Sequence, residues 1–173
     1  MDRILIAYFS HEGEAYVGGK IVELEEGNTK AAARMIQAMT GAEMFRIEPV
    51  TPYPHDHMET IEVAKKEQQA DARPPYKGKV ADMESYSTIL LGYPNWWGTM
   101  PQIVMTFLED YDLTGKTILP LCTNEGSGMG SSEKDLKQLV PGAVIGKGLS
   151  IQGGKVARSE KDIQRWLQKN HVI

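Results

Sequence analysis

Short apolar segments alternate with segments of helical spacing along the whole chain. Two of them, 3–9 (RILIAYF) and 88–93 (TILLGY), are continuous apolar runs, the pattern of strands that helices cover on both faces. A short alternating strand is predicted at 43–48 (EMFRIE), another apolar strand at 116–122 (KTILPLC) and a further strand region at 142–151. The pattern therefore predicts five strands.

A segment with helical character follows each predicted strand. In 30–39, alanine, isoleucine and methionine side chains recur at the spacing of one helical face. The other helical segments are 58–72, 102–109, 131–139 and 159–171. Strands that alternate with helices in this way form a parallel sheet with right-handed crossovers and helices on both faces, so we predict an α/β fold. In such a sheet, ligands bind beyond the carboxyl ends of the strands.

The composition is that of an ordinary globular protein. At 173 residues, with 41% hydrophobic and 24% charged residues, the chain is predicted to form a single domain, 1–173. The formal net charge of −4 offers no basic surface to a nucleic-acid backbone, so we expect no nucleic-acid partner.

The sequence gives no sign of secretion, membrane insertion or metal binding. The first apolar run has only about six residues, too few for a signal peptide or a membrane span. Cys122 is the only cysteine and cannot form an internal disulfide, so we expect a cytoplasmic protein. His55 and His57 lie in a proline-rich stretch without the spacing of a zinc site, and solvated loop histidines are the simpler interpretation.

The first loop with ligand-binding character is Gly27-Asn28-Thr29-Lys30, at the start of the first helix. The glycine lets the backbone approach a ligand, and a helix N-terminus presents unpaired N–H groups that favour a phosphate. Ser10, at the end of the first strand, offers a further hydroxyl. The alternative is a plain turn with a helix cap, because Asn and Thr also cap helices for structural reasons.

The second loop, 93–101, follows a buried strand and contains two adjacent indoles, Trp96 and Trp97. Both cannot easily reach the core, so we expect at least one to offer its face to a planar ligand, with backbone groups of Asn95 and Gly98 at the ligand's edge. The alternative is that both tryptophans pack over the sheet edge or against a partner chain.

The third loop, 123–131, follows the fourth predicted strand and has glycines at alternate positions, Gly126, Gly128 and Gly130. Glycines allow close approach of the backbone to a ligand. The spacing differs from the GxGxxG dinucleotide motif, and no acidic residue stands at the matching ribose position, which disfavours an NAD-binding fold of that type.

Together these segments resemble the flavodoxin family. The resemblance rests on 8–10 (YFS), 27–29 (GNT), 92–98 (GYPNWWG) and 123–128, and it covers nearly the whole chain. It implies a doubly wound five-stranded parallel sheet in the order 2-1-3-4-5 with one bound flavin mononucleotide (FMN). The first loop would hold the phosphate, and the second and third loops would enclose the isoalloxazine ring and the ribityl chain. The cofactor-binding residues implied are Ser10, Asn28, Thr29, Lys30, Pro94, Asn95, Trp96, Trp97, Gly98, Thr123, Asn124, Gly126, Ser127 and Gly128.

Two features depart from that family. Sixteen residues, 11–26, separate Ser10 from Gly27, where family members have a short loop. We expect a surface excursion here, with a flap over the phosphate or a dimer contact as alternatives. The chain is also only mildly acidic, whereas flavodoxins that shuttle electrons are strongly acidic, so strong electrostatic docking to a redox partner is less expected.

The resemblance implies an electron carrier between a reductase and an acceptor protein, in which the flavin performs the redox chemistry and no catalytic acid or base is needed. Two alternatives stay open. One is an NAD(P)H-dependent quinone or flavin reductase of the same fold, and the other is a non-redox module that binds a phosphorylated ligand or a partner protein through the same loops.

Overall fold

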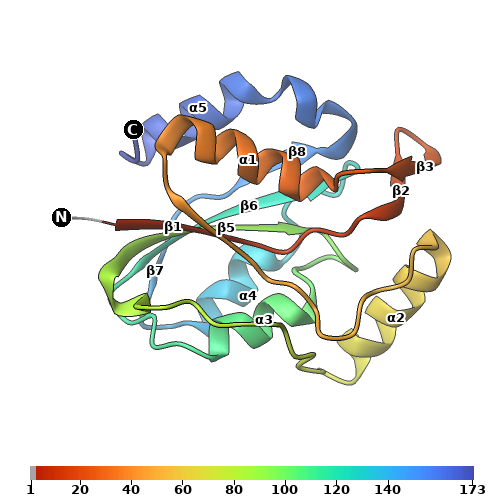
Figure 1. The fold of residues 1–173 in the computed structure, drawn as a ribbon, viewed down its shortest axis with the longest axis horizontal. Helices are drawn as coiled ribbons and strands as arrows, with labels where there is room; N and C mark the ends of the chain where they lie inside the picture. Colours follow the sequence, from red (N-terminus) through yellow and green to blue (C-terminus); the bar gives the residue numbers. More distant parts are fainter. Residues whose placement is uncertain (1–2) are drawn as a thin grey trace.

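The computed structural model describes residues 3–173, which form a parallel sheet between two layers of helices (Figure 1). Every pairing within this sheet is parallel. The strands, in spatial order, are β4 (Glu43–Arg46), β1 (Arg3–Tyr8), β5 (Tyr86–Pro94), β6 (Thr117–Asn124) and β7 (Val144–Ile145), and β8 (Leu149–Gln152) pairs with β6 beyond β7. Numbered by the five predicted segments, this is the order 2-1-3-4-5, as predicted.

The fifth predicted strand, 142–151, is interrupted and forms the two short strands β7 and β8. The carbonyl of Ile118 still accepts a hydrogen bond from the N–H of Gly146 at 3.0 Å. Two residues further along β6, Pro120 faces the same neighbour but has no N–H to donate, so the ladder cannot continue there. The sequence pattern did not indicate this break.

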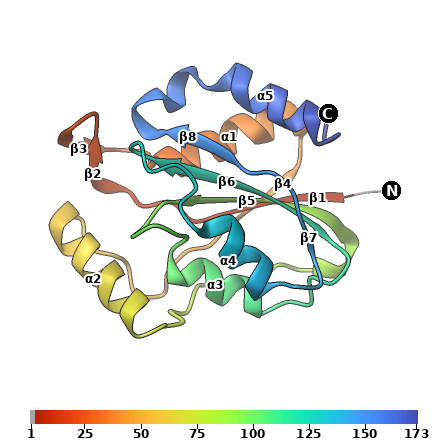
Figure 2. The ribbon, with the colours of Figure 1, turned by 180° about the vertical axis from the view of Figure 1, so that it is seen from behind.

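Helices cover both faces of the sheet (Figures 1 and 2). On one face lie α1 (Asn28–Thr40) and α5 (Glu160–Lys169), and on the other lie α3 (Gln102–Glu109) and α4 (Ser132–Leu139). The helix α2 (His57–Gln69) lies near the carboxyl ends of the strands, and two short 3-10 helices, η1 (Met83–Ser85) and η2 (Gly153–Arg158), complete the chain. No helix within residues 3–173 is long and apolar enough to cross a lipid bilayer.

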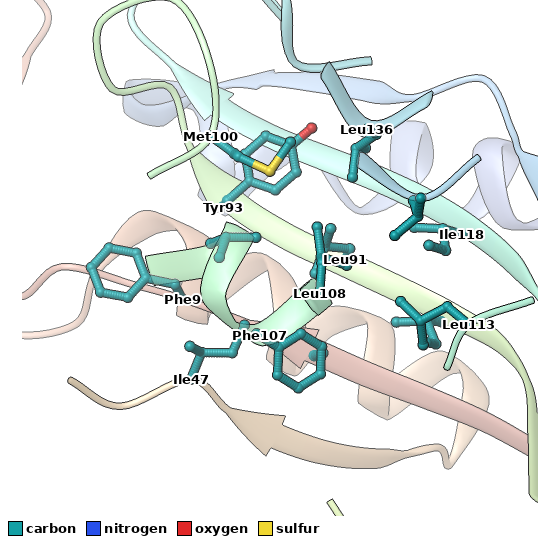
Figure 3. Packing of buried hydrophobic residues seen from close by; sticks show 14 of the residues in the cluster. Phe9, Ile47, Leu91, Tyr93, Met100, Phe107, Leu108, Leu113, Ile118 and Leu136 are labelled. Atoms are coloured by element: carbon teal, nitrogen blue, oxygen red, sulfur yellow. The ribbon is translucent and has the colours of Figure 1, made fainter. Parts of the chain in front are cut away.

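The alternation of strand side chains divides the core into two clusters. In β5, Leu90 packs with α1 and α5, and the next residue, Leu91, packs on the opposite face with α3. Figure 3 shows this second cluster, in which Phe107 and Leu108 of α3 lie against the sheet. Since both faces are buried, the central strands need the continuous apolar runs that the sequence contains.

The insertion forms an antiparallel hairpin of β2 (Gly13–Val17) and β3 (Lys20–Leu24). Gly18 and Gly19 form its turn with φ of 60° and 84°, a left-handed conformation that glycine adopts without strain. The hairpin is attached to the segment before α2, because the N–H of Glu14 donates to the carbonyl of His55 at 3.0 Å.

Candidate functional site

A cavity of about 300 Å³ opens at the carboxyl ends of β1, β5 and β6. It lies where the sheet rule places a ligand, and residues of all three predicted loops line it. Ten of the fourteen predicted residues are in its wall: Ser10, Asn28, Thr29, Pro94, Asn95, Trp96, Trp97, Thr123, Asn124 and Ser127. Lys30, Gly98, Gly126 and Gly128 are not.

Ser10 takes the place of a capping side chain at the start of α1. The helix cap is Gly27, which has no side chain, and the Oγ of Ser10 instead accepts the hydrogen bond from the N–H of Lys30 at 3.1 Å. A Cβ on Gly27 would lie 2.1 Å from that Oγ, so only glycine fits here. The first turn of α1 contains no acidic side chain, which leaves the positive end of the helix dipole available to an anion.

Thr29 links the first loop to the third. Its side chain is only 2% exposed, and its Oγ1 lies 2.8 Å from the Oγ1 of Thr123. The side chain of Lys30, in contrast, points to an ion pair, because its Nζ lies 3.6 Å from Glu12 Oε1. The ammonium group of Lys30 is therefore engaged outside the cavity wall.

The second loop closes through a tight turn. The N–H of Trp96 donates to the carbonyl of Thr99 at 2.8 Å, and both residues between them, Trp97 and Gly98, have positive φ, 56° and 86°. This conformation is costly for a tryptophan. The side chain of Asn95 supports it, accepting from the N–H of Gly98 at 2.9 Å.

The Asn95 amide also joins the second loop to the third. Its Nδ2 donates to the carbonyl of Gly128 at 3.0 Å, so one side chain holds both loops in register. Gly98 and Gly128 thus hold the loops in place through their backbone bonds to Asn95, although neither residue forms part of the cavity wall.

The two tryptophans have different surroundings. Trp96 packs edge to face against Phe9 and Tyr53, with ring centroids 5.2 and 4.9 Å apart. Trp97 is 49% exposed, and its Nε1 donates to the carbonyl of Ile61 in α2 at 2.9 Å. Packing over the sheet edge therefore describes Trp96, yet both indoles still line the cavity.

Asn124 organises the third loop. Its Oδ1 accepts from the N–H groups of Gly126 and Gly128 at 2.9 and 3.1 Å, and its Nδ2 donates to Ser150 Oγ at 2.8 Å. The two glycines line a neighbouring groove at the end of β8 rather than the main cavity. At the base of the loop, burial raises the pKa of the Cys122 thiol to about 12, so the thiol is not reactive at neutral pH.

The remaining walls come from segments that the sequence did not connect to the site. They belong to the insertion, to α2 and to the start of η2: His11, Glu14, Ala15, Tyr16, Leu24, His57, Thr60, Ile61, Ala64 and Gly153. The third loop adds Glu125, which was not among the predicted residues. The hairpin is thus part of the cavity wall and not a plain surface excursion. The N–H of His57 donates to Glu14 Oε1 at 3.2 Å, and the rings of Tyr16 and His57 stack with centroids 6.2 Å apart.

His11 is a neutral histidine in this wall. Its Nε2 lies 2.9 Å from the carbonyl of Pro54, which can only accept, so Nε2 carries the hydrogen. Burial lowers the pKa of His11 more than this hydrogen bond raises it. Within residues 3–173, no cluster of histidine, cysteine and carboxylate side chains could hold a metal ion.

Glu125 has one satisfied and one unsatisfied carboxylate oxygen. Its Oε2 accepts from the N–H of Gly18 at the hairpin turn at 3.1 Å, while Oε1 is buried and has no hydrogen-bond partner among the described residues. Oε1 lies beside Gly153. A Cβ added at position 153 would lie 2.5 Å from this oxygen and 2.4 Å from Asn28 Nδ2. A glycine at 153 therefore leaves room for both polar groups.

Comparisons with known proteins agree with this architecture. A family model described as flavodoxin matches residues 3–170. A protein from Bacteroides eggerthii, provisionally assigned as a flavoprotein, is 28% identical over 98% of both chains with a TM-score of 0.72. Another such protein, from Bacteroides uniformis, is 28% identical over 96% of this chain and 98% of its own with a TM-score of 0.74.

A more distant structure shares the fold alone. This flavoprotein from Lactobacillus acidophilus, solved in complex with FMN, is 17% identical over 91% of this chain and 98% of its own, with a TM-score of 0.68. No curated protein sequence matches the chain significantly.

Proposed function

Because the chain belongs to the flavodoxin family, we propose that it binds one FMN in this cavity and carries electrons between redox partner proteins, a reductase and an acceptor. One observation carries the proposal: a single cavity has a helix N-terminus with hydroxyl groups in its wall and two indoles from a different loop. FMN has the matching chemistry, an anionic phosphate and a flat aromatic ring.

The residues present fit such a cofactor. At the start of α1, the hydroxyl groups of Ser10 and Thr29 and the first-turn N–H groups of Asn28 and Thr29 suit a phosphate, while the N–H of Lys30 already donates to Ser10. Trp96, Trp97 and Ile61 supply aromatic and apolar surface for a ring. The unpartnered Oε1 of Glu125 also fits a ligand that carries hydroxyl donors.

The bound flavin would supply the redox chemistry, accepting and releasing electrons. The protein's part is to bind and orient it and to exclude water. Asn95 fixes the second and third loops relative to each other, so the ring site is held in one geometry. The Trp97–Gly98 peptide is restrained on both sides, because Gln68 Nε2 donates to the carbonyl of Trp97 at 3.2 Å and Asn95 accepts from the N–H of Gly98. A rotation of that peptide would break both contacts.

A second candidate function is an NAD(P)H-dependent reductase of quinones or flavins. The observation in its favour is the hairpin, which walls the cavity together with α2 and places the stacked Tyr16 and His57 rings beside it. A cavity walled by these two segments as well as by the three loops has room for a small planar substrate.

Two measurements test these functions. The purified protein, or its apoprotein titrated with FMN, should show the two visible absorption bands of a bound flavin, and the absence of binding in both would contradict the proposal. Rapid reduction by a ferredoxin reductase, without steady-state NADH or NADPH consumption in the presence of a quinone, would support the carrier. Steady-state consumption with a quinone would instead support the reductase.

A further inference from the structure

The hairpin β2–β3 is fastened on two opposite sides of the cavity. At its base, Glu14 bonds to the backbone at His55 and His57, before and at the start of α2. At its turn, the N–H of Gly18 donates to Glu125, in the loop that follows β6. The hairpin thus spans the distance from α2 to the third loop, and the turn contact depends on a single carboxylate.

The two oxygens of the Glu125 carboxylate have different surroundings. Oε2 holds the hairpin turn, and Oε1, buried in a residue of the cavity wall, has no hydrogen-bond donor among the described residues. Leaving a buried charged acceptor unsatisfied costs free energy, so a donor at this place would be strongly favoured. Asn28 Nδ2 and Glu125 Oε1 both lie against Gly153, where an added Cβ would come within 2.4 and 2.5 Å of them, but they do not bond to each other.

We propose that Glu125 Oε1 accepts a hydrogen bond from a ribityl hydroxyl of the flavin while Oε2 holds the hairpin turn, so that ligand recognition and hairpin closure share one side chain. This inference rests on the proposed function, because it assumes a flavin in the cavity. It makes Glu125 a specificity-determining residue that selects flavins with a hydroxylated side chain.

The chemistry favours a hydroxyl over the phosphate at this position. A carboxylate oxygen accepts hydrogen bonds and cannot donate them, whereas a phosphate near neutral pH is itself an anionic acceptor and would be repelled. A hydroxyl donor gives a short charge-assisted bond. The start of α1, whose first turn has no carboxylate, remains the place assigned to the phosphate.

Three flavins separate these contacts: FMN, riboflavin, which lacks the phosphate, and lumiflavin, which lacks the whole ribityl chain. In Glu125→Ala, the affinities for FMN and riboflavin should both fall about tenfold or more, equivalent to about 1.4 kcal/mol, and that for lumiflavin should stay within about twofold. The matched control is Glu23→Gln, because Glu23 is a hairpin carboxylate that pairs with His55 and lies outside the cavity wall. This variant should bind all three flavins with the affinities of the unaltered protein.

Hydrogen exchange of the hairpin gives a readout independent of affinity. In the unaltered protein, saturating riboflavin should slow hydrogen exchange over 13–24, while saturating lumiflavin should not. In Glu125→Ala, riboflavin should slow exchange over 13–24 no more than lumiflavin does. The proposal is overturned if Glu125→Ala binds riboflavin as tightly as the unaltered protein, or if it gains affinity for FMN alone, which would make Glu125 a competitor of the phosphate. A chain that binds none of the three flavins would contradict the proposed function itself.

Discussion

Replacing Thr29 by valine should separate recognition of the phosphate from stability. Valine keeps the shape of threonine, so the substitution deletes one hydroxyl at the start of α1 and its contact with Thr123. That hydroxyl can accept from Thr123 and keep its own hydrogen for a ligand oxygen. The variant thus loses a buried protein contact and a donor to phosphate at once.

The two losses have different sizes and different readouts. A buried hydroxyl left without its partner costs about 1–3 kcal/mol, which urea unfolding of the apoprotein measures. A charge-assisted bond to phosphate contributes about 1.5–3 kcal/mol, so FMN affinity should fall roughly ten- to hundredfold while riboflavin affinity changes much less. Fluorescence titration with both flavins measures the ratio.

Thr123→Val is the matched control, because it breaks the same hydroxyl pair from the other side, on β6 rather than α1. It should reduce stability by a similar amount and leave the ratio of FMN to riboflavin affinity near that of the unaltered protein. Equal losses of FMN and riboflavin in Thr29→Val, or an equal change of the ratio in both variants, would remove Thr29 from the phosphate site.

Three further predictions concern the rest of the cavity. Asn95→Ala removes one side-chain bond to the third loop and one bond within the second loop, so the free energy of unfolding should fall by about 1–2 kcal/mol and all flavins should bind more weakly; unchanged binding of lumiflavin would contradict that role. Burial lowers the pKa of His11 below its unfolded value, so the folded state binds fewer protons than the unfolded state and stability falls as pH decreases below about 6.5. Urea unfolding at pH 7 and pH 5.5 should show a smaller fall in His11→Gln, and an identical fall would refute this. The buried thiol of Cys122, whose pKa is raised to about 12, should react with an aromatic disulfide reagent only after unfolding, and fast labelling of the native protein would contradict it.

The sequence predicted the parallel sheet, and with it the part of the cavity wall that the three loops form. Parallel strands end at one edge, so loops such as 27–30, 93–101 and 123–131 must meet there whatever their separation in the chain. The break in the fifth strand was missed because it depends on Pro120 in the neighbouring strand, and the apolar pattern of 142–151 contains no sign of that partner.

The other side of the cavity was missed because long-range contacts build it. The hairpin becomes a wall through contacts such as Glu14 with His57 and Gly18 with Glu125, the second pair being 107 residues apart in sequence. Neither pair follows a periodic pattern or a motif. The bond that fixes the turn at Gly18 to Glu125 of the third loop is a property of the folded chain.

The bond between Ser10 and the N–H of Lys30 has a consequence for how this fold could vary. It brings the two ends of the insertion 11–26 into contact, since Gly27 has no room for a side chain beside Ser10. The sheet and α1 therefore meet at a fixed base, and the entropic cost of a longer loop above that base grows slowly, by about 0.6 kcal/mol for each doubling of its length. The hairpin is in effect an interchangeable module, and a designer could shorten, lengthen or replace it to change what enters the cavity without rebuilding the start of α1.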